Sequence, residues 1–310
     1  MQLCPLISAA SPQADSVATL FGWVLGVCGC IFLGIWLATA ICSRRFRVHP
    51  HEEESTPDPK QIYGSRRLEL IWTVIPAIIV GVFAVAAIAG MQTILPPMGD
   101  QKPDIIVTGH QWWWEIHYPE HGVVTANEFA IPAGKKTLVQ LESADVIHSF
   151  WIPELAPKQD MIPGASRHIW LEPYEPGKFS GVCAEFCGTQ HAWMRFEISS
   201  LAPEEFASWI AKQKAVAAAS TMEGAKVFDE MNCRECHSIQ GTEATANVAP
   251  DLTHFASRET LASGVVPNNR ENLTQWLQDP DSIKPGSHMP NFNLSGTDIS
   301  ALVAYLETLR

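Results

Sequence analysis

Two long runs of uncharged, mostly apolar residues constrain this chain more than any other feature. No Asp, Glu, Lys or Arg occurs between Ser16 and Ser43, and none occurs between Leu70 and Gly99. A helix needs about 20 apolar residues to cross the hydrocarbon core of a bilayer, so both runs are long enough to span. The sequence therefore predicts two transmembrane helices, over about residues 16–42 and 70–95.

The charges beside these runs predict their orientation. Basic residues near the ends of a span favour the cytoplasmic side of the membrane. The connection between the two runs carries six of them, namely Arg44, Arg45, Arg47, Lys60, Arg66 and Arg67. A cytoplasmic connection places everything after about Gly99 outside the cytoplasm. Residues 1–15 contain no Lys or Arg, so they lack the basic region of a cleaved secretory signal.

The part of the chain after the second run is acidic. Residues 100–310 hold 15 basic and 27 acidic residues, which accounts for the whole net charge of −12. A nucleic acid partner is not expected, because such a surface repels the phosphate backbone. The acidity favours a basic protein partner, although it is equally consistent with a charge that only keeps the domain soluble.

Residues 100–200 show short β-rich runs separated by Pro and Gly. Such runs cover residues 104–108, 137–141, 168–171 and 194–198. Strands this short and this frequent predict an all-β sandwich or barrel. The run Gly109–Trp114 is interpreted as strand, which would put Trp112 and Trp114 on one face and Trp113 on the other.

The remaining residues have helical patterns. Residues 201–220 are interpreted as a helix and an Ala-rich linker, and residues 221–310 as a compact unit with helices over 222–231, 272–278 and 297–309. Thr297 is predicted to cap the last helix. Its apolar stripe comprises Ile299, Leu302, Val303 and Leu306. The predicted organisation is thus a membrane segment (1–99), a β domain (100–200), a linker (201–220) and an α-helical domain (221–310).

The first cluster of chemically active residues lies in the β domain. Cys183, Cys187, His191 and Met194 fall within twelve residues. Soft sulfur ligands combined with imidazole suit copper in electron-transfer sites, and two thiolates on one loop are able to bridge two metal ions. A zinc site and a disulfide between Cys183 and Cys187 are the alternatives.

The second cluster lies in the α-helical domain. Cys233-Arg234-Glu235-Cys236-His237 is the C-x-x-C-H motif of covalent haem attachment, in which both thiols bond the haem vinyl groups and His237 remains as iron ligand. Electron-transfer haems often have Met as the second ligand. Met289, in a Gly/Pro-rich loop, is the candidate and His288 its competitor. A chance match or a redox C-x-x-C motif is the alternative.

These motifs carry two resemblances. Residues 221–310 resemble a class I cytochrome c, including the segment Ala249-Pro250-Asp251-Leu252. The resemblance implies an all-α fold in which the carbonyl of Pro250 orients the proximal His237. Once His148 is added, the pattern H…C-x-E-x-C-x3-H-x2-M makes residues 16–199 similar to cytochrome c oxidase subunit II. That resemblance implies a two-helix transmembrane hairpin and a cupredoxin-like domain.

The second resemblance also implies site residues. The dinuclear CuA ligands would be His148, Cys183, Glu185 through its carbonyl, Cys187, His191 and Met194. The carboxylate of Glu185 would bind a magnesium ion shared with subunit I. Trp112 would be the residue through which electrons reach the copper, and Glu69 would lie at the mouth of a proton path into subunit I. Asp145 matches an acid near the face where the donor docks.

Taken together, the chain resembles subunit II of a caa-type terminal oxidase. The resemblance implies that a soluble or membrane-associated cytochrome c-type donor, basic if charge steers it, reduces covalent haem c. Electrons would continue to CuA and subunit I, where oxygen is reduced with proton pumping; subunit III is a further expected partner. The expected location is the bacterial inner membrane, multi-pass, with periplasmic soluble domains.

Both soluble domains are acidic, so the contact between haem and copper is expected to be apolar or local, with Trp112 a candidate. The competing interpretations are a quinol oxidase subunit, which keeps the fold without the copper ligands, a copper carrier or redox sensor, and a nitrous oxide reductase.

Overall fold

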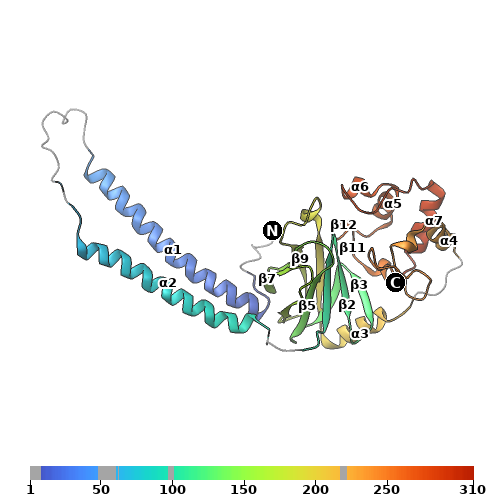
Figure 1. Cartoon of the computed structure of the whole chain (residues 1–310), viewed down its shortest axis with the longest axis horizontal. Coiled ribbons are helices and arrows are strands. Elements are labelled where there is room, and N and C mark those ends of the chain that lie inside the picture. The colour runs from blue at the N-terminus through green and yellow to red at the C-terminus, as the bar shows by residue number, and fades with distance from the viewer. Residues whose placement is uncertain (1–7, 48–60, 62, 97–100, 217–221) are drawn as a thin grey trace. The chain divides into compact units, whose positions relative to one another are not determined.

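The computed structural model describes residues 8–47, 61, 63–96, 101–216 and 222–310 (Figure 1). The chain forms two compact units. One comprises Asp15–Thr93, and the other comprises Ile94–Arg310 together with the residues before Asp15.

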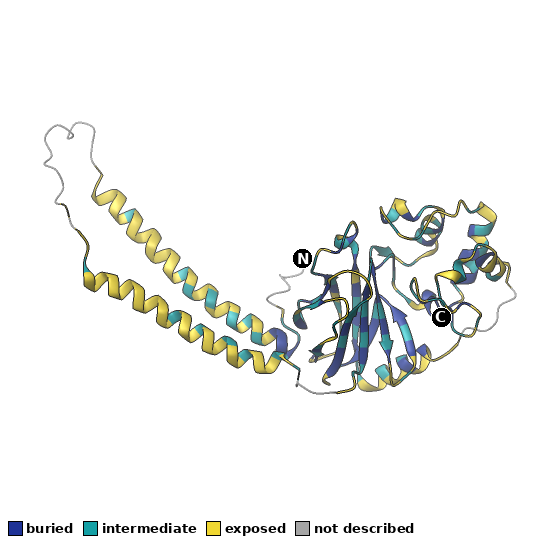
Figure 2. Cartoon of the chain, viewed as in Figure 1, coloured by how far each residue is buried: buried dark blue, intermediate teal, exposed yellow. Residues whose placement is uncertain are grey.

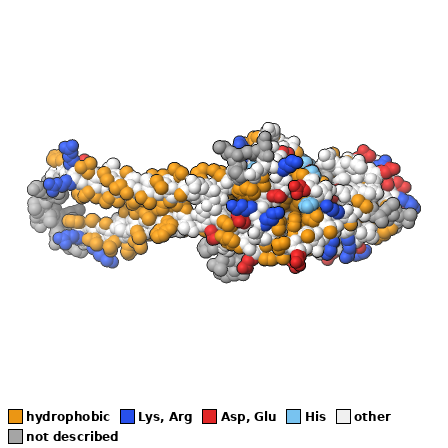
Figure 3. All heavy atoms as spheres, turned by 90° about the horizontal axis from the view of Figure 1, so that it is seen from below, with side chains coloured by type: hydrophobic (Ala, Val, Ile, Leu, Met, Phe, Trp, Pro, Cys, Tyr) orange, Lys and Arg blue, Asp and Glu red, His pale blue; other side chains and the backbone are white. Residues whose placement is uncertain are grey.

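The first unit is a pair of long apolar helices. Helix α1 covers Pro12–Arg45 and α2 covers Arg66–Ile94, with mean hydropathies of 2.3 and 2.6 in their most apolar windows. Apolar side chains are exposed along both helices, and basic side chains gather at the end beside their connection (Figures 2 and 3). A helix that is apolar all round is suited to lipid rather than water. Both predicted apolar helices are confirmed, each is long and apolar enough to cross a membrane, and both extend past the apolar runs into their charged ends.

The β domain consists of two five-stranded sheets. One sheet has the order β3-β2-β1-β5-β8 and the other β4-β10-β9-β6-β7. Their strands are β1 Ile105–His110, β2 Trp113–Tyr118, β3 Val123–Ala126, β4 Glu128–Pro132, β5 Thr137–Ser143, β6 His148–Ile152, β7 Ala156–Met161, β8 Arg167–Leu171, β9 Gly177–Cys183 and β10 Arg195–Leu201. Each sheet has one parallel pair, β1 with β5 and β4 with β10. The predicted all-β fold is confirmed.

The core between the sheets positions the metal-ligand region. Alternate residues of β1 are buried, as a half-buried strand requires. Trp114, Phe150 and Phe196 pack together, with ring centroids 4.5–5.6 Å apart. Cys183, Cys187 and Met194 belong to the same buried cluster, so the candidate ligands lie on the margin of a rigid core. Helix α3, Pro203–Gln213, adds Phe206 and Trp209 to this cluster.

The α-helical domain is built on a crossing of its first and last long helices. Its helices are α4 Glu223–Glu230, α5 Arg270–Gln278, α6 Pro280–Ile283 and α7 Gly296–Leu306, and a short hairpin is formed by β11 Thr260–Leu261 and β12 Val266–Pro267. A Cβ at Gly224 would lie 2.1 Å from the carbonyl oxygen of Ala301, so α4 approaches α7 this closely because residue 224 has no side chain. The four residues of the predicted stripe on α7 are all buried.

Two local predictions were wrong. Helix α7 begins at Gly296, and its cap is Ser295, whose hydroxyl accepts a hydrogen bond from the backbone N–H of Asp298. Ser295 lies just before the helix, three residues ahead of Asp298, and can accept a hydrogen bond from a free N–H group of the first turn, whereas Thr297 is already helical. Trp112 is not on a strand. Because His110 pairs with Trp113 across β1 and β2, Gln111 and Trp112 form the turn that connects these strands.

Candidate copper and haem centres

Four elements bring the predicted copper ligands together. His148 begins β6 and Cys183 ends β9, and these strands are paired antiparallel with Phe150 opposite Cys183. The loop after β9 carries Glu185 and Cys187. His191 opens the short 3-10 helix η1, His191–Trp193, which leads to Met194 at the start of β10. The strand frame therefore places an upstream histidine beside a loop that is far away in sequence.

The distances between the donor atoms suit a shared metal site. The Sγ atoms of Cys183 and Cys187 lie 3.8 Å apart, and the Nδ1 atom of His148 lies 3.9 Å from the Cys183 sulfur. On the other side, the Cys187 sulfur lies 3.7 Å from His191 Nδ1 and 3.8 Å from Met194 Sδ. Ligands about 2.3 Å from one metal at tetrahedral angles are about 3.8 Å apart, so the residues fit.

The same geometry bears on the two alternatives. Cys183 and Cys187 are both free, and their separation of 3.8 Å is far longer than the roughly 2.05 Å of a disulfide bond. The carbonyl oxygen of Glu185 lies 3.2 Å from the Cys183 sulfur. A structural zinc site is closed by four ligands, such as two Cys and two His, and has no use for a thioether. Here the Glu185 carbonyl and the Met194 thioether raise the number of donors to six, which fits a dinuclear copper centre better.

The electrostatics of the site prepare a thiolate. The hydrogen bond from Cys187, supported by His148, lowers the pKa of the Cys183 thiol to about 3. The Cys183 thiolate in turn raises the pKa of Cys187, so one proton is retained by the pair. Metal ligation by both sulfurs must release that proton, which makes copper loading depend on pH.

Asp145 fixes the orientation of His148. The Nε2 atom of His148 lies 2.8 Å from Asp145 Oδ1, so Nδ1 faces the cysteines. Burial opposes both the imidazolium of His148 and the carboxylate of Asp145. Hydrogen bonds with Cys183 and Asp145 nevertheless raise the pKa of His148. Hydrogen bonds from His148 and two backbone N–H groups lower the pKa of Asp145. A carboxylate that holds the outer nitrogen of a ligating histidine is a common support of metal sites.

Glu185 presents two groups in two directions. Its carbonyl oxygen faces Cys183, as described above, while its carboxylate is 45% exposed and lies 3.9 Å from the ammonium of Lys158. Phe186, the next residue, is 76% exposed. The carboxylate is therefore free to meet a further ligand or partner without disturbing the copper side.

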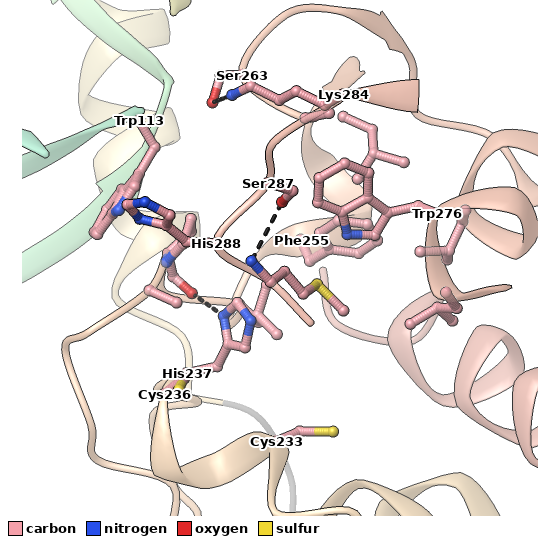
Figure 4. A pocket seen from close by; sticks show the side chains of 18 of the residues that line it. Trp113, Cys233, Cys236, His237, Phe255, Ser263, Trp276, Lys284, Ser287 and His288 are labelled. Atoms are coloured by element: carbon pink, nitrogen blue, oxygen red, sulfur yellow. Dashed lines mark hydrogen bonds between the residues drawn. The ribbon is translucent and has the colours of Figure 1, made fainter. Parts of the chain in front are cut away.

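The haem motif lies on one wall of a cavity of about 280 Å³. Cys233, Cys236 and His237 follow α4 and face this cavity from below in Figure 4. The Nδ1 atom of His237 donates a hydrogen bond of 2.7 Å to the carbonyl of Pro250, which leaves Nε2 as the ligand atom. Burial lowers the pKa of His237, so the imidazole is neutral, the form that binds iron.

The side chains on the opposite wall of the cavity and one buried guanidinium also suit a haem. Met289 and His288 both line the cavity, but Met289 packs against the helical core, whereas the ring of His288 lies against Trp112 with centroids 4.5 Å apart. This arrangement favours Met289 over His288 as second iron ligand. The guanidinium of Arg258 also lines the cavity, and its buried Nε has no hydrogen-bond partner among the described residues. A haem carboxylate is a suitable acceptor for it.

Residues of the β domain form part of the same cavity. Trp112 and Trp113 line it, and the indole N–H of Trp112 donates a 2.9 Å hydrogen bond to the carbonyl of Cys187. The predicted role of Trp112 thus has a geometric basis, since this residue contacts both centres. The contact between the two domains is local, as expected, but it is not purely apolar. Glu128 accepts hydrogen bonds from the backbone N–H groups of Glu259 and Thr260, and Lys178 pairs with Glu259.

Glu69 lies in the first turn of α2, at the end of the span that adjoins the basic connection. A Cβ at Gly64 would lie 3.1 Å from its carboxylate, so the side chain folds back over the residues before the helix. This position agrees with the predicted location at a membrane edge, while the proton-path role stays a prediction.

Four residues that contact these sites were not anticipated from the sequence. Gln111 donates to the carbonyl of Cys187, Gln190 donates to the carbonyls of Lys284 and Pro285, and Lys284 and Ser263 both reach the carbonyl of Trp112. Their partners lie 76 to 172 residues away in the chain. No local pattern signals such contacts, because the first joins two distant loops of the β domain and the others depend on how two domains meet.

Comparisons with known proteins agree with this architecture. Three family models match in order: the transmembrane domain of cytochrome c oxidase subunit II over residues 1–89, its periplasmic domain over 121–201, and cytochrome c over 221–310. Cytochrome c oxidase subunit 2 of Alkalihalophilus pseudofirmus is 40% identical over 276 residues, covering 86% of this chain and 79% of the relative. The same subunit of Bacillus sp. PS3 is 35% identical, covering 86% and 80%.

A solved structure, the periplasmic domain of subunit II of cytochrome oxidase from Bradyrhizobium japonicum, is 35% identical and covers 37% of this chain and 96% of its own, with a TM-score of 0.35. The family models and the relatives over most of both chains decide the assignment. They imply copper and haem as cofactors, membrane association and partnership with subunit I of a haem-copper oxidase. The chain belongs to the cytochrome c oxidase subunit II family and carries a fused cytochrome c domain.

Proposed function

We propose that this chain is the subunit through which electrons enter a proton-pumping terminal oxidase. A cytochrome c-type donor reduces the haem c domain, the electron passes to a CuA centre in the β domain, and subunit I receives it for oxygen reduction. The observation that carries the proposal is the joint placement of two ligand sets: four donors around the sulfurs of Cys183 and Cys187, and a cavity bounded by Cys233, Cys236 and His237.

The protein's part at the copper centre is to hold the ligands still. Bound between the thiolates of Cys183 and Cys187, a dinuclear copper centre supplies reversible one-electron transfer. His148 is fixed by Asp145, and the loop is fixed by hydrogen bonds from Gln111 and Trp112 to the Cys187 carbonyl. Ligands held in one arrangement in both oxidation states keep the reorganisation that accompanies electron transfer small.

The protein's part at the haem is attachment and ligation. The Pro250 carbonyl orients His237. A haem at this site would be held covalently by Cys233 and Cys236, with His237 and Met289 as its iron ligands and Arg258 beside one of its carboxylates. Held in this way, it would supply electron transfer.

The remaining assignments extend the proposal to the assembled oxidase. The exposed carboxylate of Glu185 binds a magnesium ion together with subunit I, and Glu69 lies at the start of a proton path in that subunit. Subunit III is a further partner, and the donor is basic because residues 100–310 carry the net negative charge. The soluble domains lie on the periplasmic side, since the basic connection of the spans favours the cytoplasm.

Purification of the oxidase from the native membrane tests the proposal. We expect multi-line copper hyperfine structure in the EPR spectrum, covalent haem c absorbance, and a co-purifying haem-copper subunit. Cys187→Ser should abolish the dinuclear copper signal and leave the haem c absorbance unchanged. Glu175→Gln, an exposed change on the same domain, serves as the matched control. Mononuclear copper, zinc in place of copper, or the absence of a large partner would contradict the proposal.

A quinol oxidase subunit is the second candidate, because a quinol oxidase subunit 2 of Bacillus subtilis is 28% identical over 233 residues. Such a subunit has no use for the copper ligands, yet here all six donors converge and the haem motif is intact. Oxidation of quinol by the purified complex, without copper in this chain, would favour that candidate instead.

A further inference from the structure

We propose that Lys284 is a positioning residue that locks the haem-ligand loop onto the copper domain and thereby sets the rate of electron transfer between the two centres. The inference rests on the proposed function and deepens it. It concerns a side chain that belongs to neither ligand set.

Lys284 reaches from one domain into the other. It follows α6, five residues before Met289, and is only 4% exposed. Its Nζ donates a 2.8 Å hydrogen bond to the backbone carbonyl of Trp112 and lies 3.2 Å from the hydroxyl of Ser263. That hydroxyl donates to the same carbonyl at 3.0 Å. The turn that carries Trp112 is thus held by two donors from the α-helical domain.

The backbone of the same loop is held from the copper side. The Nε2 atom of Gln190, the residue before His191, donates to the carbonyls of Lys284 and Pro285 at 2.9 and 3.0 Å. The copper-ligand loop is therefore bonded directly to the loop that supplies the second haem ligand. Figure 4 shows Lys284 and Ser263 together on the side of the cavity opposite Cys233.

Burying the amine of Lys284 has a free-energy cost that an exposed surface lysine does not have. None of the salt bridges among the described residues pairs it with a carboxylate, and burial lowers the pKa of its amine to about 7. A buried amine without a counter-charge loses its hydration, and hydrogen bonds must offset that loss. One of its two acceptors, the carbonyl of Trp112, belongs to the other domain, so that hydrogen bond exists only when the domains are docked.

The hydrogen bonds from Lys284 and Ser263 hold Trp112, the residue that joins the two centres. Trp112 contacts His288, the neighbour of Met289, through its ring and the Cys187 carbonyl through its indole N–H. Fixing the Trp112 carbonyl therefore fixes both contacts at once. Electron transfer slows as the contact between donor and acceptor loosens, so loss of this anchor should reduce the transfer rate measurably.

The test compares Lys284→Met with Lys178→Met in the whole purified oxidase. Methionine keeps the length and apolar volume of the side chain and removes the donor. Lys178 provides the matched control, because it also bridges the two domains, to Glu259, but it is 58% exposed. Exposed ion pairs contribute little to association. An electron is delivered to haem c by a photoreductant, and haem c reoxidation is followed with time.

We expect Lys284→Met to slow reoxidation about tenfold, while the haem c absorbance and the copper EPR spectrum stay unchanged. Lys178→Met should stay within about twofold of the wild-type rate. Lys284→Gln, which retains N–H donors, should be faster than Lys284→Met. If Lys284→Met fails to assemble, Ser263→Ala replaces it, since it removes the second donor without adding volume, and it should slow transfer in the same direction.

A wild-type rate in Lys284→Met with both spectra intact would overturn the role of Lys284 and leave the proposed function standing. An equal slowing in Lys178→Met would also overturn it, because any loosening of the interface would then suffice. If Lys284→Met does not assemble, a wild-type rate in Ser263→Ala would likewise overturn the role of Lys284. Absence of either spectrum from the wild-type oxidase would refute the proposed function itself.

Discussion

The ring of His288 lies against the ring of Trp112, with centroids 4.5 Å apart and planes at 47°. His288 precedes the proposed haem ligand Met289, and Trp112 is hydrogen-bonded to the carbonyl of the proposed copper ligand Cys187. The two proposed centres are therefore connected through one pair of aromatic side chains from different domains. Both side chains belong to turns or loops, which is where the domains meet.

Replacing Trp112 should slow transfer from haem to copper. Trp112→Leu removes the ring and the indole N–H that reaches Cys187, and we expect haem c reoxidation to slow about tenfold or more in the whole oxidase. Trp113→Leu is the matched control, because Trp113 lines the cavity but stacks on His110 at 4.3 Å instead of contacting a ligand residue. Equal rates in the two variants would refute the route through Trp112.

Loss of Asp145 should weaken copper binding without removing a ligand. Asp145→Asn cannot accept the His148 N–H as a carboxylate does, and outer partners of metal ligands are typically worth about 10 to 100-fold in affinity. Competition with a copper chelator measures this change, with the exposed Glu175→Gln as the control. If Asp145 served only donor docking, copper affinity would be unchanged and only the reaction with the donor would weaken.

The helix crossing in the haem domain should not tolerate a side chain at Gly224. Gly224→Ala places a Cβ 2.1 Å from the Ala301 carbonyl, so α4 and α7 must separate. Overpacking of this kind typically costs about 1–3 kcal/mol, and thermal unfolding of the haem domain should shift downwards. Gly296→Ala, where a Cβ would meet nothing within 4 Å, should leave the transition unchanged or raise it. A shift of equal size in both variants would contradict the crossing.

The β domain should lose stability in alkali through Tyr118. Its hydroxyl donates to the Ala130 carbonyl at 2.7 Å and accepts from the Ala130 N–H, and burial raises the pKa of the phenol. Because the unfolded phenol ionises near pH 10, the folded state binds the proton more tightly and stability falls as pH rises above about 10. Tyr118→Phe should remove part of this slope and cost about 1–3 kcal/mol at neutral pH.

Denaturant unfolding at pH 7 and at alkaline pH measures both effects. Tyr174→Phe, a change at a half-exposed tyrosine, is the control. A slope that is the same in Tyr118→Phe and in wild type would show that other groups cause the alkaline loss.

The sequence predicted the elements well and the contacts between domains poorly. Hydropathy and charge were enough for α1 and α2, and the spacing of sulfur and imidazole residues was enough to group Cys183, Cys187, His191 and Met194. The family resemblance added His148. These signals are local or belong to one motif. Trp112 was placed on a strand because alternation is the simplest interpretation of an aromatic run, whereas the pairing of His110 with Trp113 turns the chain there.

Lys284 illustrates what the sequence could not show. It is one lysine in a loop of an acidic domain, and nothing near it predicts burial. Its acceptor, the carbonyl of Trp112, lies 172 residues away. Like charge on both domains predicted a local contact, and the structure adds the specific donors and acceptors that make it.

The central claim is that the copper loop is a relay that receives its electrons from the haem domain. Time-resolved absorbance after photoreduction of haem c in the whole oxidase tests this most directly. We predict that the near-infrared band of the oxidised copper pair bleaches at the same rate as haem c is reoxidised, before the haem of subunit I is reduced. Bleaching of the copper band that precedes haem c reduction, or haem c that stays reduced while subunit I turns over, would contradict it.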